Sequence, residues 1–592
     1  MSKKKPRQKK TSSSVPRTPA DALEGRERVA AERTESEDTA RWWREVVESI
    51  VIAVVLAVVF RAFEAEAFVI PTGSMAPTLQ GRHKELRCEQ CNYMFRSGDS
   101  EDSPQVAAVT CPECRYVTRI NPKNADQASF SGDRILVNKW LYEFKDPERW
   151  DVIVFKFPGS GKQNYIKRLV GLPGEQLMVR HGDVFVRTGE DQPFTITRKP
   201  ADKLPHIMQT VHDSNFVPES LIQAGWPARW SGVGDGDASW EGSANQSTFT
   251  LTESTSGTAW LRYLHAVPDD QQWAQVENSL SVTGMEHAPS LITDYYENND
   301  VIFMNGRRNM TPYGHFWVGD IALECEIQVQ DGTGVLALDI VEAGRHHTCE
   351  INVADGSATL KISNGSYLFD AGTDGEEIAE LTADTAVRGP GSYDVRYANV
   401  DDQLLLWINN RLVTWQANGQ PHHATYQAPE DERPVWSAED PGDLRPIGVG
   451  GRGLTLTVKD LRVLRDVYYV ATDGFDEYLV SKMDSYRILR SPEDWSTTEL
   501  FDKRNAVYFP AQGVLGPDEF FPMGDNSPFS KDARLWTDDN RYGADGQLDP
   551  VPGYVRRDLL IGKAFMVYWP HPWNLGGRLP IIPNVQRMKR IR

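Results

Sequence analysis

An apolar run near the N-terminus constrains the arrangement of this chain more than any other feature. Ser49–Phe60 comprises twelve residues without a charge. Twelve residues are short for a membrane span, but residues 42–70 together are long enough, and two tryptophans stand at the start, where interfacial anchors occur. The pattern therefore predicts a transmembrane helix over residues 42–68.

The residues before this run predict its orientation. Residues 1–40 contain ten Lys/Arg and seven Asp/Glu. By the positive-inside rule, we expect a disordered basic tail over residues 1–41 in the cytoplasm and the rest of the chain on the far side of the membrane. One alternative is a cleaved signal peptide, because Ala65-Glu66-Ala67 resembles a cleavage site. The charged leader is, however, far longer than an ordinary signal-peptide n-region.

The composition of the chain limits the kind of protein that it can be. The 592 residues are 40% hydrophobic and 25% charged, with a net charge of −19. These values exclude a largely disordered or polytopic membrane protein. An acidic body also argues against a nucleic-acid partner, since phosphate binding needs a basic surface.

Two separated segments contain candidate chemical groups. Pro71 and Gly73 predict a turn that presents the hydroxyl of Ser74. Asn164–Glu175 is typical of a strand entering a Pro-Gly turn, and Lys167 has apolar neighbours on its own face. Desolvation there would lower the pKa of the lysine, which a lysine acting as general base requires.

These segments belong to a set that resembles type I signal peptidase, a membrane-anchored Ser-Lys endopeptidase. The order of the matching segments, directly after a single N-terminal span, carries the resemblance. They are Pro71–Leu79, Gly132–Lys139, Asp151–Glu175, Met523–Trp536 and Asp558–Pro570.

The resemblance implies roles for particular residues. Ser74 would be the nucleophile and Lys167 the general base, as in other Ser-Lys variants of the serine triad. Thr72 would donate to the oxyanion beside the backbone N–H of Ser74. The supporting residues implied are Ser530, which would orient the lysine, and the charge pairs Asp525 with Arg168 and Asp532 with Arg534. Gly524–Ser530 departs from the family pattern, because Ser-Pro-Phe replaces an Arg and a second Asp.

Two insertions interrupt the matching segments. The first contains Cys88-x2-Cys91 and Cys111-x2-Cys114, a spacing that predicts a structural tetrathiolate zinc site of zinc-ribbon type. Two disulfides, favoured by the compartment, or redox thiols are the alternatives.

The second insertion contains short alternating strands and resembles concanavalin- or laminin-G-like jelly rolls. We interpret Asp401 and Asp402 as a solvated turn and His346 and His347 as surface residues. Whether Cys325 and Cys349 pair stays open.

Together these features predict a mainly β protein, with a signal-peptidase-type β catalytic core after one transmembrane helix. The chain would then be a single-pass protein of the inner membrane that removes signal peptides from exported preproteins. Its partners would be these preproteins, the lipid bilayer and the secretion machinery, and it would need no catalytic cofactor. The alternatives are a self-cleaving Ser-Lys peptidase and a carbohydrate- or protein-binding sandwich on an inactive scaffold. We expect the sandwich to be dispensable for the chemistry. The predicted parts of the core are residues 69–80, 130–211 and 504–592, with the zinc ribbon at 81–129 and the sandwich at 212–503.

Overall fold

The computed structural model divides the chain into two units, Met1–Glu66 and Ala67–Arg592. The predicted tail over residues 1–41 lies outside the described residues. The structure describes residues 42–55, 65–99, 105–124, 127–233, 240–252, 257–283, 289–308, 313–330, 333–371, 375–471, 485–502, 505–538, 540–542, 548–570, 573–575, 579–582 and 584–592.

The described residues of the segment predicted to span a membrane form a helix and the start of a strand. Residues 42–55 form a helix, and residues 56–64 lie outside the described residues. The predicted C-terminal end at residue 68 is wrong, because strand β1 (Ala65–Val69) occupies it and pairs with β7 (Arg134–Asn138). Within the described residues, no helix has the length and apolar character needed to cross a bilayer.

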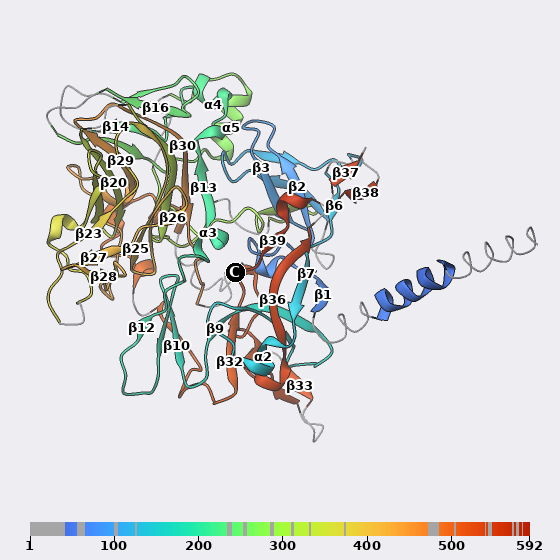
Figure 1. Cartoon of the computed structure of the whole chain (residues 1–592). Helices are drawn as coiled ribbons and strands as arrows, with labels where there is room; N and C mark the ends of the chain where they lie inside the picture. Colours follow the sequence, from blue (N-terminus) through green and yellow to red (C-terminus); the bar gives the residue numbers. More distant parts are fainter. Residues whose placement is uncertain are drawn as a thin grey trace, which may run out of the picture. The chain divides into compact units, whose positions relative to one another are not determined.

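An eight-stranded antiparallel sheet brings together segments that are far apart in sequence (Figure 1). Strand β9 lies between β8 and β32, so that the third and fourth matching segments become neighbours. The strand order is β1, β7, β36 (Leu560–Trp569), β8 (Val152–Lys156), β9 (Asn164–Gly171), β32 (Glu519–Met523) and β35 (Val555–Arg556), with β39 (Lys589–Arg590) paired to β36.

A smaller sheet and several short elements complete this region. Its four strands are β12 (Thr195–Ile196), β11 (Asp183–Arg187), β10 (Gln176–Arg180) and β31 (Val507–Phe509). The short elements include α2 (Leu141–Phe144), α3 (Leu204–Ile207), α7 (Ser485–Ile488) and the hairpins β33–β34 (Asn540–Tyr542, Leu548–Pro550) and β37–β38 (Trp573–Leu575, Leu579–Ile582).

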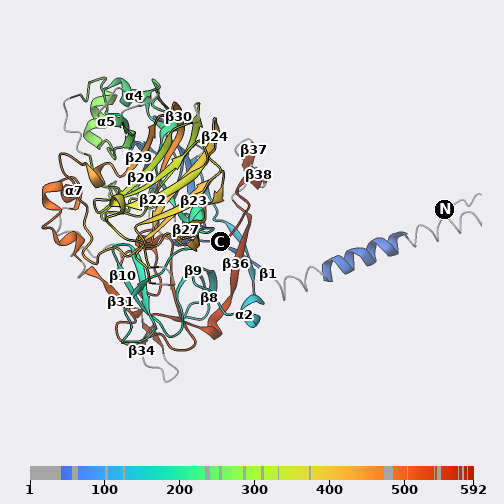
Figure 2. The ribbon, with the colours of Figure 1, turned by 60° about the vertical axis from the view of Figure 1, so that its left-hand side comes forward.

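The second insertion folds as two antiparallel sheets packed face to face, as predicted (Figure 2). Alternation places residues such as Leu323 and Ile327 in the core between the sheets, where both are fully buried. The first sheet contains β15 (Trp240–Gly242), β16 (Thr248–Leu251), β30 (Leu456–Arg465), β19 (Ile321–Val329), β24 (Gly391–Val400), β25 (Gln403–Ile408) and β26 (Arg411–Leu412), with β13 (Gln209–Asp213) paired to β30. The second contains β14 (Trp230–Val233), β17 (Ala259–Tyr263), β29 (Ile447–Arg452), β20 (Val335–Glu342), β21 (Arg345–Asn352), β22 (Ser357–Ile362), β23 (Glu380–Asp384), β27 (Trp415–Ala417) and β28 (Gln420–His422).

The sandwich is joined to the rest of the body by buried charges. Lys199 Nζ lies 2.6 Å from Asp401 Oδ1 and 2.7 Å from Asp466 Oδ2. The prediction of a solvated turn at Asp401 is therefore wrong, because its side chain neutralises a buried lysine. His347 is also buried, and its Nδ1 contacts the backbone oxygen of Ile340, so it is not a surface residue.

The cysteine-rich segment shares a hydrophobic core with the second insertion. One small sheet contains β3 (Met94–Gly98), β2 (His83–Arg87) and β6 (Ser129–Phe130). A second contains β18 (Val301–Phe303), β4 (Val106–Thr110) and β5 (Val117–Arg119). Strand β18 belongs to the second insertion, as do α4 (Glu219–Gln223) and α5 (Asp270–Glu277). Trp226 and Trp273 pack against the cysteines, and Trp273 Nε1 donates to Cys114 O at 2.7 Å. The two predicted insertions are therefore packed together.

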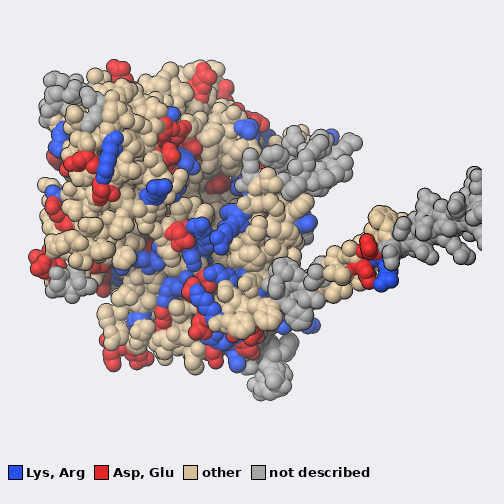
Figure 3. All heavy atoms as spheres, viewed as in Figure 1, with Lys and Arg blue, Asp and Glu red and all other residues tan. Residues whose placement is uncertain are grey.

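The surface charge of the Ala67–Arg592 unit is uneven. Although the chain is acidic overall, Lys and Arg side chains gather in the middle of one face, around the C-terminal strand β39 (Figure 3).

Candidate active site

The turn that carries Ser74 follows directly from strand β1. Ile70 N donates to Asp133 O at 2.9 Å, and the chain then forms a single 3₁₀ turn, η1 (Gly73–Met75). Met75 is fully buried, as is Leu79 four residues later. These buried side chains fix the turn, while Ser74 itself remains partly accessible.

Lys167 meets Ser74 from the adjoining strand. On β9, Lys167 lies opposite Ile153 of β8 and is 3% exposed. Its Nζ donates to Ser74 Oγ at 2.7 Å. Burial lowers the pKa of Lys167 to about 8, although Asp532 and Asp525 act in the opposite direction. A large fraction of neutral amine is thus present near pH 8, and a neutral amine can accept the serine proton.

Both expected charge pairs are present and buried. Arg168 binds Asp525 through two hydrogen bonds, Nε–Oδ1 at 2.6 Å and Nη2–Oδ2 at 2.7 Å. Arg534 does the same with Asp532, at 2.8 and 2.7 Å. Because Arg168 follows Lys167 in the chain and Asp525 follows Gly524, the first pair fixes the loop after β32 next to β9.

The departure from the family pattern forms an ordered turn. Residues Ser527–Phe529 form a 3₁₀ turn, η9. Arg534 donates to Ser527 Oγ and to Ser527 O, both at 2.9 Å. The guanidinium of Arg534 therefore fixes the backbone at Ser527, where the departure from the family pattern begins.

Two of the predicted residues do not make the expected contacts. Ser530 is buried, yet its Oγ has no hydrogen-bond partner in the described part of the chain, and so it does not reach Lys167. Thr72 is exposed, and its side chain does not cap η1. The roles of both residues stay predictions.

Sequence reasoning missed two asparagines beside the nucleophile. Asn526 N donates to Ser74 O, and Asn526 Nδ2 donates to Gly73 O, both at 3.1 Å. The side-chain amide of Asn526 also pairs reciprocally with that of Asn299, at 2.7 Å in each direction. The matching segment around Gly524 could have indicated Asn526, whereas no local signal marks Asn299 in the second insertion.

The four N-terminal cysteines form a compact cluster of free thiols. Cys88 Sγ lies 3.6 Å from Cys114 Sγ, and Cys91 Sγ lies 3.5 Å from Cys111 Sγ. All four sulfurs lie within 4.8 Å of one another. Tetrahedral Zn–S bonds of about 2.3 Å place neighbouring sulfurs about 3.8 Å apart, so these residues fit zinc and are too far apart for disulfides. Cys325 and Cys349 are likewise free and buried.

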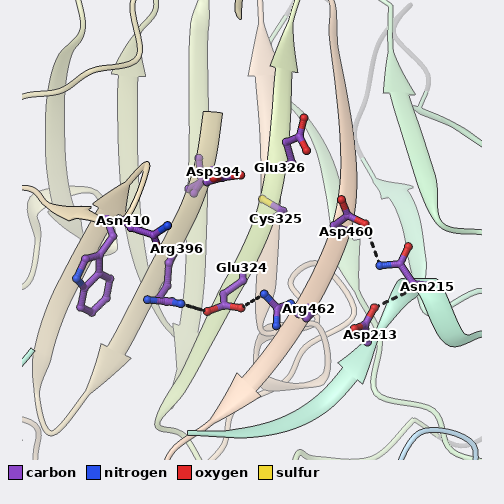
Figure 4. Close-up of a pocket in the computed structure, with 12 residues that line it drawn as sticks. Asp213, Asn215, Glu324, Cys325, Glu326, Asp394, Arg396, Asn410, Asp460 and Arg462 are labelled. Carbon is purple, nitrogen blue, oxygen red and sulfur yellow. Dashed lines mark hydrogen bonds and ion pairs between the residues drawn. The ribbon is translucent and has the colours of Figure 1, made fainter. Parts of the chain in front are cut away.

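A separate pocket of about 440 Å³ opens on the first sheet of the sandwich (Figure 4). Glu324 lies at its centre, between Arg396 and Arg462, and Asn215 donates to Asp460 at 2.9 Å. Its lining also includes Asp213, Cys325, Glu326, Asp394, Val395, Trp407 and Asn410.

Comparison with known proteins connects the N-terminal half of the chain to one family. The profile of the family described as signal peptidase, peptidase S26, matches residues 43–120 and 106–270. The probable signal peptidase I-2 of a Synechocystis species is 30% identical over 149 residues, 24% of this chain and 45% of that protein. Signal peptidase I of Leptolyngbya laminosa is 30% identical over 165 residues, 27% of this chain and 56% of that protein.

These matches are partial. The chain spans about half the length of these two relatives. Among solved structures, carbohydrate-binding module CBM66 from Bacillus subtilis is 11% identical, with 40% of this chain and 95% of that chain covered at a TM-score of 0.20. A likeness at this TM-score carries no functional inference.

Proposed function

We propose that the protein is a membrane-anchored serine endopeptidase that removes signal peptides from exported preproteins. The observation that carries the proposal is the 2.7 Å contact between Ser74 Oγ and the buried amine of Lys167, in a chain similar to signal peptidases over residues 43–270. The catalytic body would lie outside the cytoplasmic membrane, beside the bilayer and the secretion machinery.

The chemistry follows from the two side chains. Neutral Lys167 accepts the Ser74 proton as Ser74 Oγ attacks the scissile carbonyl carbon. The backbone N–H of Ser74 and the hydroxyl of Thr72 would donate to the oxyanion. The resulting Lys167 ammonium gives its proton to the leaving amine, which leaves an acyl-enzyme ester on Ser74. Water, deprotonated by Lys167, then hydrolyses this ester and regenerates both residues.

Activity of purified full-length protein on a preprotein tests this function. We expect Lys167→Ala to abolish cleavage. Lys156→Ala is the matched control, since Lys156 is exposed on the adjacent strand β8. Wild-type rates in Lys167→Ala would contradict the proposed mechanism.

We assign a structural role to a zinc ion at Cys88, Cys91, Cys111 and Cys114. Four thiolates leave no coordination position for substrate, so the metal would hold the fold of this segment and take no part in the reaction.

The sandwich pocket favours a second function, binding of a neutral hydroxyl-rich ligand such as a saccharide. Its volume is in the range of small-molecule sites, and it offers both donors and acceptors. Glu324 and Glu326 are neutralised by Arg396, Arg462 and Lys459, whereas three further carboxylates disfavour an anionic ligand. Calorimetry with neutral oligosaccharides tests this, and we expect Arg462→Ala to abolish binding. Absence of binding by wild type would contradict the second function.

A further inference from the structure

One segment of the second insertion passes directly beside the proposed nucleophile. It comprises residues 295–300, here called the bridging segment, and it lies between the cysteine-rich segment and the catalytic loops. Gly98 N, at the end of β3, donates to Asn298 O at 2.9 Å. The amide of Asn298 also packs on Gly73, where an added Cβ would lie 2.9 Å from Asn298 Nδ2.

Buried charges and rings hold the bridging segment in place. Arg308 binds Asp300 through two hydrogen bonds of 2.7 and 2.8 Å, and donates to Thr110 Oγ1 at 2.6 Å. The guanidinium of Arg115 stacks over Tyr295 at 3.7 Å from the ring centre. Because Thr110 and Arg115 flank the second cysteine pair, the cysteine-rich segment supports the bridging segment from behind.

The bridging segment reaches the nucleophile through one amide pair. Asn299 and Asn526 are both buried, and each donates to the other at 2.7 Å. Asn526 in turn donates to the carbonyl oxygens of Gly73 and Ser74. A buried amide that loses its partner pays the full desolvation penalty, and it will rotate or shift to regain a hydrogen bond.

We propose that Asn299 is a positioning residue for Ser74, so that the insertion is part of the catalytic apparatus. This proposal rests on the peptidase function proposed above. By fixing the side chain of Asn526, Asn299 holds the Gly73 carbonyl group, while the backbone N–H of the same Asn526 holds the Ser74 carbonyl group. Together these contacts set the Ser74–Lys167 distance. The expectation that the insertion is dispensable for the chemistry is therefore revised, because its removal takes away Asn299.

Kinetics of full-length variants on one preprotein separate positioning from stability. Displacement of a reacting group by about 1 Å commonly costs up to about 100-fold in rate. We expect Asn299→Ala to lower kcat about 10- to 100-fold with KM within about threefold. The matched control is Asn399→Ala, because Asn399 is equally buried in the sandwich and its side chain is likewise hydrogen-bonded to neighbouring side chains, those of Glu342 and Tyr426. We expect its thermal midpoint to fall while its kcat stays within twofold of wild type.

Two further variants keep the test decisive. Asn299→Asp preserves size but places a carboxylate against Asn526 Oδ1, so we expect about a 10-fold loss of kcat even if Asn299→Ala does not fold. In a double-mutant cycle, Asn299→Ala should add nothing to Asn526→Ala, since both remove the same amide pair.

Wild-type kcat in folded Asn299→Ala or in Asn299→Asp would overturn the proposal, as would equal losses in Asn299→Ala and Asn399→Ala. Failure of the peptidase function is a separate result, because it appears as an inactive wild type or as unchanged cleavage by Ser74→Ala.

Discussion

Replacement of Lys167 by methionine should stabilise the folded protein while it abolishes cleavage. Methionine has a similar length and no charge. In the wild type, burial lowers the pKa of Lys167 from 10.5 to about 8, so the folded state disfavours the ammonium. At about 1.36 kcal/mol for each pKa unit, this lowering corresponds to about 3 kcal/mol of destabilisation of the folded state when Lys167 is charged. The hydrogen bond to Ser74 that methionine loses contributes about 1 kcal/mol in the other direction. The net gain expected at pH 7 is therefore about 2 kcal/mol.

The sign of this effect depends on pH. Between about pH 8 and 10.5 the unfolded wild type holds one proton more than the folded wild type, so its stability rises with pH through this interval. Lys167→Met lacks this titration. Its advantage should therefore be constant below about pH 8, fall as the pH rises, and become a disadvantage of about 1 kcal/mol by about pH 10.5, which is a total change of about 3 kcal/mol.

Urea unfolding of both proteins, followed by tryptophan fluorescence from pH 7 to 10.5, measures the difference directly. Because other titrating groups act equally in both proteins, only the pH dependence of the difference matters. A difference that stays constant within about 1 kcal/mol across this range would show that Lys167 is not held as a depressed-pKa amine.

Three further results are expected. Thr72→Ala should lower the rate of preprotein cleavage about 10²–10³-fold if its hydroxyl serves the oxyanion, and a smaller loss would leave the backbone N–H of Ser74 as the main donor. Purified protein should contain about one zinc per chain by metal analysis, lost in Cys111→Ser, and a metal-free protein with thiols blocked until reduction would show disulfides instead. Asp525→Asn should lower the free energy of unfolding in urea by about 3–5 kcal/mol, because it leaves Arg168 buried without its charged partner. The control Asp518→Asn, at the exposed pair with Arg557, should lower it by less than about 1 kcal/mol. Equal losses in the two variants would contradict this burial argument.

The sequence predicted the parts of this site that depend on local pattern. The turn at Ser74 and the strand through Lys167 follow from Pro-Gly chemistry and apolar alternation, and both are present. The alternation of Leu323, Ile327 and their neighbours likewise predicted the sandwich. The paired Cys-x2-Cys spacing predicted the cluster of four thiols.

What the sequence did not predict depends on contacts between distant segments. Asp401 lies in a turn by pattern, but Lys199, about 200 positions earlier in the chain, pairs with it in a buried interface. Asn299 has no motif of its own and gains its importance only because the insertion folds back onto Asn526. The C-terminal end of the predicted span was wrong because Ala65–Val69 forms a strand that pairs with β7. The hydrophobicity of these residues does not distinguish such a strand from a helix.

The central claim is that Ser74 attacks the scissile bond with Lys167 as its base, and a trapped intermediate tests it most directly. Full-length protein mixed with a preprotein, acid-quenched within one turnover and digested, can be analysed by mass spectrometry for an acyl group. We predict that the peptide containing Ser74 carries the signal-peptide acyl group as an ester, with a mass gain equal to that of the free signal-peptide acid minus one water, and that neither Ser74→Ala nor Lys167→Ala forms this ester. An acyl group on another residue, or preprotein cleavage by Ser74→Ala at the wild-type rate, would contradict the claim.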